Sequence, residues 1–124
     1  MTIAFLCVFL SIFIPLVLVG YAKFSRKGYD NHHPREFLEK LEGKYKRANY
    51  AQMNAYEAFP PFAAGVIIAH ISGAIQSQVD LLAVTFVISR VLYSIFYVVD
   101  QHVLRSVVWF IGFACVIGLF VISF

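Results

Sequence analysis

The segment that most constrains the fold is the first one, residues 3–22, which has about twenty residues and no charged side chain. As a helix rising 1.5 Å per residue, it is long enough to cross a hydrocarbon core of roughly 30 Å. It lacks the basic leading region and the small-residue cleavage site of a signal peptide. We therefore predict a permanent membrane-spanning helix, bent at Pro15.

The composition extends this interpretation to the whole chain. Hydrophobic residues make up 60% of the 124 residues, charged residues make up 14%, and the mean hydropathy is +0.76. A soluble domain of this length would expose too much apolar surface, so we predict a single-domain, all-α integral membrane protein. Cys7 and Cys115 lie inside apolar segments and are not expected to form a disulfide.

Three further apolar segments follow the first and predict a four-helix bundle. We expect helices at about 3–22, 45–76, 81–99 and 106–124, with a polar loop at 23–44. Most of the basic residues lie in this loop. Their clustering favours membrane orientation over nucleic-acid binding as the reason for the net charge of +3, and it predicts that the loop faces the cytoplasm. Short polar turns are expected at Gln76–Asp80, on the opposite side, and at Asp100–Arg105, on the cytoplasmic side.

The second helix has two special features. Pro60 and Pro61 are predicted to kink it, because proline supplies no backbone donor. Beyond them Gly65, Ala69 and Gly73 recur every four residues. Such a stripe of small residues lets another helix approach closely.

The loop contains adjacent histidines, His32 and His33, which raise the question of a metal site. Neighbouring residues point in different directions on most backbones, and no further ligand follows at a suitable spacing. We therefore predict a solvated loop and no metal site.

Polar residues also follow one face of the second helix. Arg47, Tyr50, Asn54 and Glu57 are spaced three or four residues apart, so they lie on the same side of a helix. Burying unpaired polar groups in a membrane is costly, so this face is expected to serve a function.

The third helix carries a similar face, formed by Arg90, Tyr93 and Tyr97. The two helices run in opposite directions from the cytoplasmic side, so their polar faces should converge at one depth. Purely structural roles remain open: Arg47 could snorkel to the interface, the tyrosines could belong to an aromatic belt, and Glu57 could simply neutralise Arg90. Three polar groups within apolar segments nevertheless favour a binding site.

The residue types indicate which ligand would fit. Arginines bind carboxylates through paired, charge-assisted hydrogen bonds, Glu57 can accept from an ammonium group, and Asn54 can bond a peptide unit. The set is typical of a site for a small zwitterionic peptide with several carboxylates. The surrounding lipid suits an apolar second substrate, and a nearby arginine would stabilise a bound thiolate.

The chain resembles the membrane-associated proteins in eicosanoid and glutathione metabolism, the MAPEG family, which includes the microsomal glutathione transferases. The resemblance covers nearly the whole chain and rests on two motifs: Arg47-Ala-x-x-Ala51-x-x-Asn54-x-x-Glu57-x-x-Pro60 and Arg90-x-x-Tyr93-x-x-x-Tyr97. The short loops are most similar to those of bacterial members, which implies a location in the bacterial inner membrane. Several members have an arginine where this chain has Tyr50, and Arg47 would have to substitute for it.

The resemblance implies a homotrimer that binds glutathione between neighbouring subunits on the cytoplasmic side. Asn54, Glu57, Arg90, Tyr93 and Tyr97 would line this site, and we count Arg47 and Tyr50, from the same helical face, among the glutathione-binding residues. Arg105 would correspond to the arginine that activates the thiol in catalytic members. The expected activity is that of a glutathione transferase or peroxidase, with glutathione as co-substrate and a hydrophobic small molecule or lipid as acceptor.

Two other functions are consistent with parts of the sequence. The family also contains a non-catalytic member, so a lipid- or partner-binding protein of the same fold is an alternative, and Tyr50 favours it. Small proton-coupled drug exporters also have four helices in about this length. Their essential carboxylate lies in the first helix, however, and residues 3–22 contain none.

Overall fold

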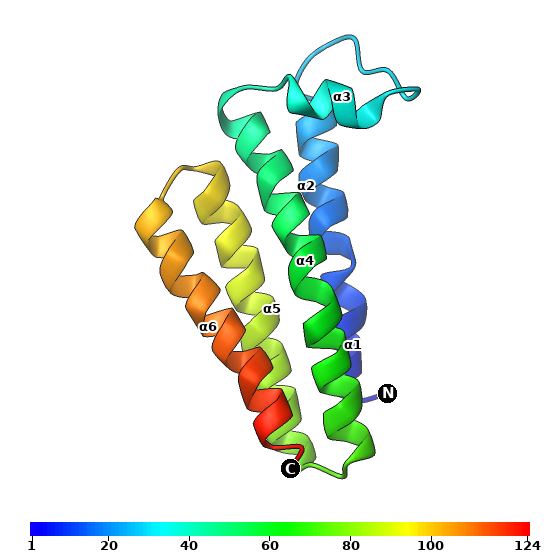
Figure 1. The fold of residues 1–124 in the computed structure, drawn as a ribbon, viewed down its shortest axis with the longest axis vertical. Helices are drawn as coiled ribbons and strands as arrows, with labels where there is room; N and C mark the ends of the chain where they lie inside the picture. The colour runs from blue at the N-terminus through cyan, green and yellow to red at the C-terminus, as the bar shows by residue number, and fades with distance from the viewer.

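The computed structural model describes residues 1–124 and consists of α-helices joined by short connections (Figure 1). The helices are α1 (Ile3–Ser11), α2 (Phe13–Lys23), α3 (Pro34–Glu39), α4 (Gly43–Ile71), α5 (Gln76–Val98) and α6 (His102–Val121). α1 and α2 are stacked end to end as one rod, which lies alongside α4, α5 and α6. The short α3 lies across one end of these long helices, and both chain termini lie at the other end (Figure 1).

The break between α1 and α2 falls at Ile12. Pro15 accounts for its position, because a helix would require the amide of residue 15 to donate to the carbonyl of Ser11 and proline has no such donor. The position of the predicted bend thus corresponds to a one-residue interruption at Ile12, whose own backbone stays in the helical region at φ −62° and ψ −32°. The rod continues beyond it to Lys23.

α4 continues as a helix through Pro60 and Pro61, but it ends at Ile71 rather than near residue 76. Gly73 adopts φ +75°, a left-handed conformation that glycine tolerates well. The amide of Ala74 donates to the carbonyl of Ala69 at 3.0 Å, and that of Gly73 donates to His70 at 3.2 Å. These two bonds form a Schellman motif, which ends the helix while its sequence is still apolar.

The third and fourth predicted helices begin earlier in the structure than the sequence indicated. α5 begins at Gln76 rather than near 81, so the polar residues expected to form a turn are its first turn. The Asp80 carboxylate accepts from the Gln76 side chain at 2.8 Å and from the Ala4 amide at 2.9 Å, which ties α5 to the start of α1. α6 begins at His102 rather than near 106, after a turn in which Asp100 has φ +64°.

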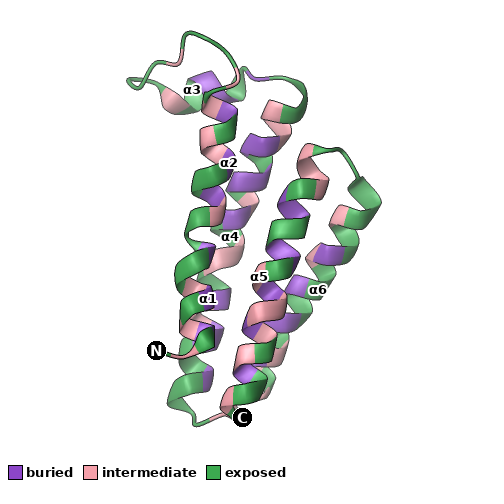
Figure 2. Cartoon of the chain, turned by 180° about the vertical axis from the view of Figure 1, so that it is seen from behind, coloured by how far each residue is buried: buried purple, intermediate pink, exposed green.

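Two apolar clusters hold the helices together. The larger one joins α1, α4, α5 and α6 around the fully buried Phe62, Val66 and Leu119, and the smaller one packs α3 against α2 and α4. Within the larger cluster, Gly65 makes the predicted close approach: a Cβ added there would lie 3.2 Å from the Cβ of Leu119 on α6. Figure 2 shows that the buried faces of the long helices turn toward one another.

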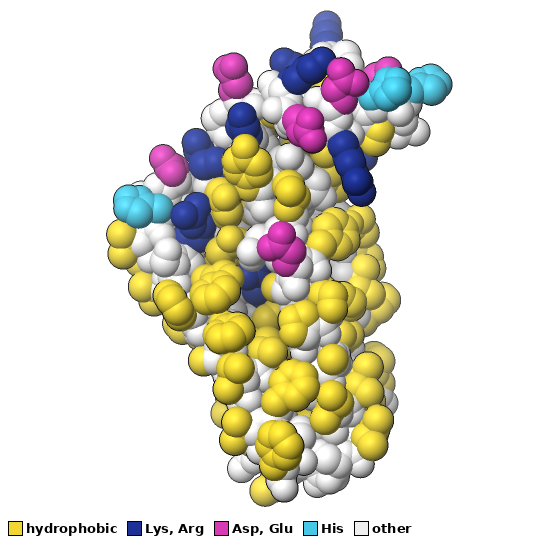
Figure 3. Space-filling view, in the orientation of Figure 1, with side chains coloured by type: hydrophobic (Ala, Val, Ile, Leu, Met, Phe, Trp, Pro, Cys, Tyr) yellow, Lys and Arg dark blue, Asp and Glu magenta, His cyan; other side chains and the backbone are white.

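The outer surface is apolar over most of the molecule's length. Hydrophobic side chains cover the body, whereas charged side chains gather at the α3 end (Figure 3). Three helical stretches are long and apolar enough to cross a membrane: Ile3–Lys23, Gln76–Val98 and His102–Val121. α4 is not among them, and its role as a further membrane-spanning helix stays a prediction.

The loop before α3 contains the adjacent histidines. Asp30 accepts from the His32 amide at 2.9 Å, and its carboxylate lies 2.8 Å from His32 Nδ1. These bonds to the ionised carboxylate, first from the amide and then from the ring, lower the pKa of Asp30. His32 thus completes a local turn. The two cysteines, Cys7 and Cys115, are buried free thiols.

Candidate functional site

Arg90 and Asn54 meet where α5 packs against α4. Arg90 Nη2 donates to Asn54 Oδ1 at 2.6 Å, and Asn54 Nδ2 donates to Glu57 Oε2 at 3.4 Å. Arg90 is 4% exposed, and its Nε atom is buried without a protein partner. Asn54 therefore links a buried cation to an exposed carboxylate, and one nitrogen of that cation is buried without a hydrogen-bond partner.

Aromatic side chains continue this set along α5. The guanidinium carbon of Arg90 lies 4.2 Å from the centre of the Tyr93 ring, and the rings of Tyr93 and Tyr97 meet edge to face at 5.7 Å. The guanidinium carbon of Arg105 lies 4.3 Å from the centre of the Tyr97 ring. Arg105 belongs to the first turn of α6, so the short α5–α6 connection places it beside the last turn of α5. We call these six residues, Glu57, Asn54, Arg90, Tyr93, Tyr97 and Arg105, the polar chain.

Two hollows open along the polar chain. The first has a volume of about 220 Å³, and Asn54, Glu57 and Arg90 form its polar lining. The second, of about 230 Å³, is lined by Tyr93, Tyr97, Arg105, Ser106, Trp109 and Phe110. Trp109 of α6 lines both hollows and thereby connects them. A single elongated ligand could contact cationic groups at both ends of such a site.

Comparison with known proteins agrees with these features. The family model described as MAPEG family matches residues 1–124, the whole chain. The chain belongs to the MAPEG family. Neither the curated proteins nor the solved structures contain a match to it. Together with the three apolar helices, this membership makes the chain an integral membrane protein related to glutathione and eicosanoid metabolism, and it confirms the family resemblance predicted from the two motifs.

Two of the residues predicted for the site of this MAPEG protein lie outside the polar chain. Arg47 Nε donates to the carbonyl of Val98 at 3.1 Å, so its side chain satisfies the end of α5. Tyr50 is 43% exposed and lines another hollow, of about 800 Å³ between α4 and α3, which Glu57 is the one residue of the polar chain to line. Arg35 and Glu39 also line that hollow. The predicted face that starts at Arg47 therefore meets two different elements: Arg47 and Asn54 contact α5, whereas Tyr50 faces α3.

The structure also adds residues to the surroundings of the site. Trp109 and Ser106 come from α6, which the sequence motifs did not cover beyond Arg105. On α4, Gln52 Nε2 donates to Asn49 Oδ1 at 2.9 Å, and both side chains are buried. The sequence could have predicted this pair from its three-residue spacing, because two polar residues at that spacing lie on one face of a helix.

Proposed function

We propose that this protein is a membrane glutathione transferase or peroxidase that acts on hydrophobic electrophiles or lipid hydroperoxides. The proposal covers glutathione as co-substrate, Arg105 as the residue that activates its thiol, and the rest of the polar chain as the groups that bind it. Membership of the MAPEG family supports the glutathione-related part of this function.

The observation that carries the proposal is the continuity of the polar chain from Glu57 to Arg105. Asn54 bridges Glu57 and Arg90, and two tyrosines connect Arg90 to Arg105. Glutathione has two carboxylates, one ammonium group and one thiol. A carboxylate at one end of the chain and arginines within it and at its other end complement these charges in a low-dielectric setting.

An assembly of several chains is part of the proposal. Ligand sites in proteins usually have volumes of roughly 300–1,000 Å³. Each of the two hollows alone, at about 220 and 230 Å³, is below this range, and even together they lie near its lower end, which leaves room for a neighbouring chain to add to the site. A homotrimer of four-helix bundles, as the family resemblance implies, would complete each site with residues of a neighbouring subunit.

The proposed reaction begins with transfer of the glutathione thiol proton to solvent. The positive charge of Arg105 stabilises the resulting thiolate, which is the reactive nucleophile. In conjugation, the sulfur forms a bond to the electrophilic carbon, and the displaced electron pair leaves with the leaving group. In peroxide reduction, two glutathione molecules are oxidised to their disulfide as the hydroperoxide becomes an alcohol and water.

The proposed orientation follows the distribution of charge. Six of the ten basic residues lie at positions 23–44, and by the positive-inside rule we infer that this segment faces the cytoplasmic side of a bacterial inner membrane. In this arrangement α4 spans the membrane as the fourth helix. The polar chain then opens near the cytoplasmic surface, where glutathione is available.

Mixing the purified protein with glutathione in a stopped-flow ultraviolet spectrometer tests the proposal. We expect a thiolate absorbance band with the unchanged protein and with Lys27→Ala, which removes an exposed charge at the same end of the molecule. Arg105→Ala should abolish the band. If the unchanged protein gives no band, or if Arg105→Ala retains it, the proposed activation is wrong.

One observation favours a non-catalytic relative of the same fold as the second candidate. Tyr50 occupies a position where several family members have arginine, and it lines the hollow beside α3 rather than the polar chain. A lipid- or partner-binding protein would give no thiolate band and would show no glutathione binding by calorimetry. The same stopped-flow experiment therefore discriminates between the two functions.

A further inference from the structure

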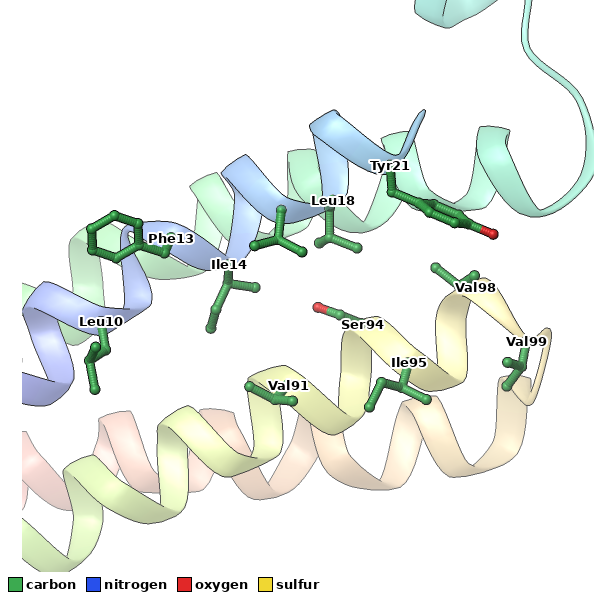
Figure 4. A pocket seen from close by; sticks show the side chains of 11 residues that line it. Leu10, Phe13, Ile14, Leu18, Tyr21, Val91, Ser94, Ile95, Val98 and Val99 are labelled. Carbon is green, nitrogen blue, oxygen red and sulfur yellow. The ribbon is translucent and has the colours of Figure 1, made fainter. Parts of the chain in front are cut away.

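A large apolar hollow lies on another flank of α5, between this helix and the rod formed by α1 and α2 (Figure 4). Its volume is about 530 Å³, and ten of its eleven lining residues are hydrophobic. The remaining one, Ser94, donates its hydroxyl to the carbonyl of Arg90 at 2.9 Å and so offers no free donor. We call this hollow the α2–α5 groove. It shares no lining residue with the two hollows of the polar chain.

The length and the openness of the groove match one leaflet of a membrane. It extends from Leu10 to Tyr21 along the rod (Figure 4). These eleven steps rise about 16 Å at 1.5 Å per residue, which is about half of a hydrocarbon core of roughly 30 Å. Val17 in its wall is 70% exposed, so the groove opens sideways to the surroundings. An extended acyl chain of the leaflet on the α3 side has the matching length and polarity.

The end of the groove at Tyr21 is positively charged. The ring of Tyr21 packs against that of Tyr45 at 5.1 Å, and the ammonium group of Lys44 lies 5.1 Å from the Tyr45 ring and beside the Tyr21 hydroxyl. The groove thus ends near an exposed cation that is flanked by two phenol groups.

The wider surroundings of this end are also basic. Residues 23–46 contain seven lysines and arginines and four acidic residues, which leaves a net charge of 7 − 4 = +3 with histidine neutral. Two of the acidic residues are already paired, Asp30 with His32 and Glu36 with Lys40. Basic residues close to a membrane surface attract anionic lipid headgroups. Charge and shape therefore favour the same kind of occupant.

We propose that the α2–α5 groove binds one acyl chain of an anionic phospholipid, with the lipid phosphate at Lys44 and the Tyr21 hydroxyl. The chain would lie between Leu10 and Val98 in the leaflet on the α3 side. This lipid is distinct from the acceptor substrate, because the groove is separated from the polar chain by α5 itself. The proposal stands whether or not the protein reacts with glutathione.

Native mass spectrometry of the full chain tests this site. The protein is released from micelles that contain equal amounts of phosphatidylglycerol and phosphatidylcholine with identical acyl chains. We expect one phosphatidylglycerol to be retained per chain, with about a fivefold preference over phosphatidylcholine, as one surface cation would give. Val17→Trp, which fills the groove, should remove the retained lipid. Val107→Trp is the matched control, because Val107 lies on the exposed surface of α6 outside the groove.

The charge is tested separately with Lys44→Gln. This variant should retain lipid but lose the preference for phosphatidylglycerol, whereas Lys27→Gln, at an exposed loop position outside the groove, should keep it. Three results would overturn the proposal: no retained lipid, retention unchanged by Val17→Trp, or equal retention of both lipids by the unchanged protein. Dissociation of an oligomer by Val17→Trp, with no lipid involved, would assign the groove to a second copy of this chain instead.

Discussion

The two flanks of α5 differ in how their side chains are satisfied. On one flank, Arg90 donates to Asn54 of α4, Tyr97 lies against Arg105 of α6, and Tyr93 contacts both Arg90 and Tyr97. On the other flank, Val91 and Ile95 face the α2–α5 groove, whose wall is apolar and partly open. One helix thus separates a set of fixed charges from a surface suited to lipid. The comparison predicts that the flanks can be altered independently.

The largest expected effect comes from the polar flank. Arg105→Ala should lower the rate of glutathione conjugation by about 10²–10³-fold, the range found when one group that stabilises a developing anion is removed. Arg105→Lys keeps the charge but not the planar guanidinium, so it should recover part of the rate. Single-turnover measurements with saturating glutathione separate this chemical step from binding. A rate for Arg105→Ala within threefold of the unchanged protein would contradict the assignment.

Arg90→Gln should have the next largest effect, on glutathione binding. Hydrogen bonds to charged groups contribute about 1.5–3 kcal/mol, which corresponds to a loss of roughly 10- to 100-fold in affinity. Because Asn54 accepts directly from Arg90, the double variant with Asn54→Ala should lose less than the sum of the two single losses. Isothermal calorimetry on the four proteins measures this coupling. Additive losses would show that the hydrogen bond does not serve binding.

The third prediction compares two glycines, Gly112 in a tightly packed helix contact and Gly20 at an open position. A Cβ added at Gly112 on α6 would lie 2.7 Å from Ser89 Oγ on α5, so Gly112→Ala must displace a hydroxyl that now donates to Phe86 at 2.6 Å. We expect it to reduce the free energy of unfolding by about 1–3 kcal/mol. Gly20→Ala is the matched control, because no atom lies within 4 Å of its added Cβ. Thermal unfolding in one detergent compares them, and equal midpoints would contradict the predicted difference.

Local spacing predicted the polar chain apart from Arg105, which was assigned through the family resemblance. Asn54 and Glu57 are three residues apart on one helix, as are Arg90 and Tyr93 on another, and helical spacing predicts a shared face directly. The spacing does not identify which neighbour that face meets. Arg47 lies on the predicted face, yet it bonds to the end of α5, and Tyr50 turns toward α3. These outcomes depend on the path of the loop between α2 and α4, which helical periodicity does not determine.

The hydrophobic pattern of the sequence could not predict the α2–α5 groove or the helix ends, for two further reasons. The groove is lined by Leu, Ile, Val and Phe from helices that are not consecutive in the chain, and these residues are common on every apolar segment. α4 ends at Ile71 because Gly73 adopts a left-handed conformation, although the hydrophobic residues Ala74 and Ile75 follow. Composition marks where a helix can continue, whereas backbone capping decides where it stops.

The smallest expected effect tests the independence of the flanks directly. Val17→Trp fills the α2–α5 groove, which shares no lining residue with the two hollows of the polar chain. Substitutions at separate sites rarely couple by more than a few tenths of a kcal/mol. The glutathione thiolate band should therefore keep its amplitude within about twofold. Stopped-flow absorbance of this variant and of Val107→Trp measures the band under the same conditions. A much larger loss in Val17→Trp alone would mean that occupancy of the groove positions α5, and with it Arg90 and Tyr97. In that case the lipid would act on the reaction through the one helix that the two flanks share.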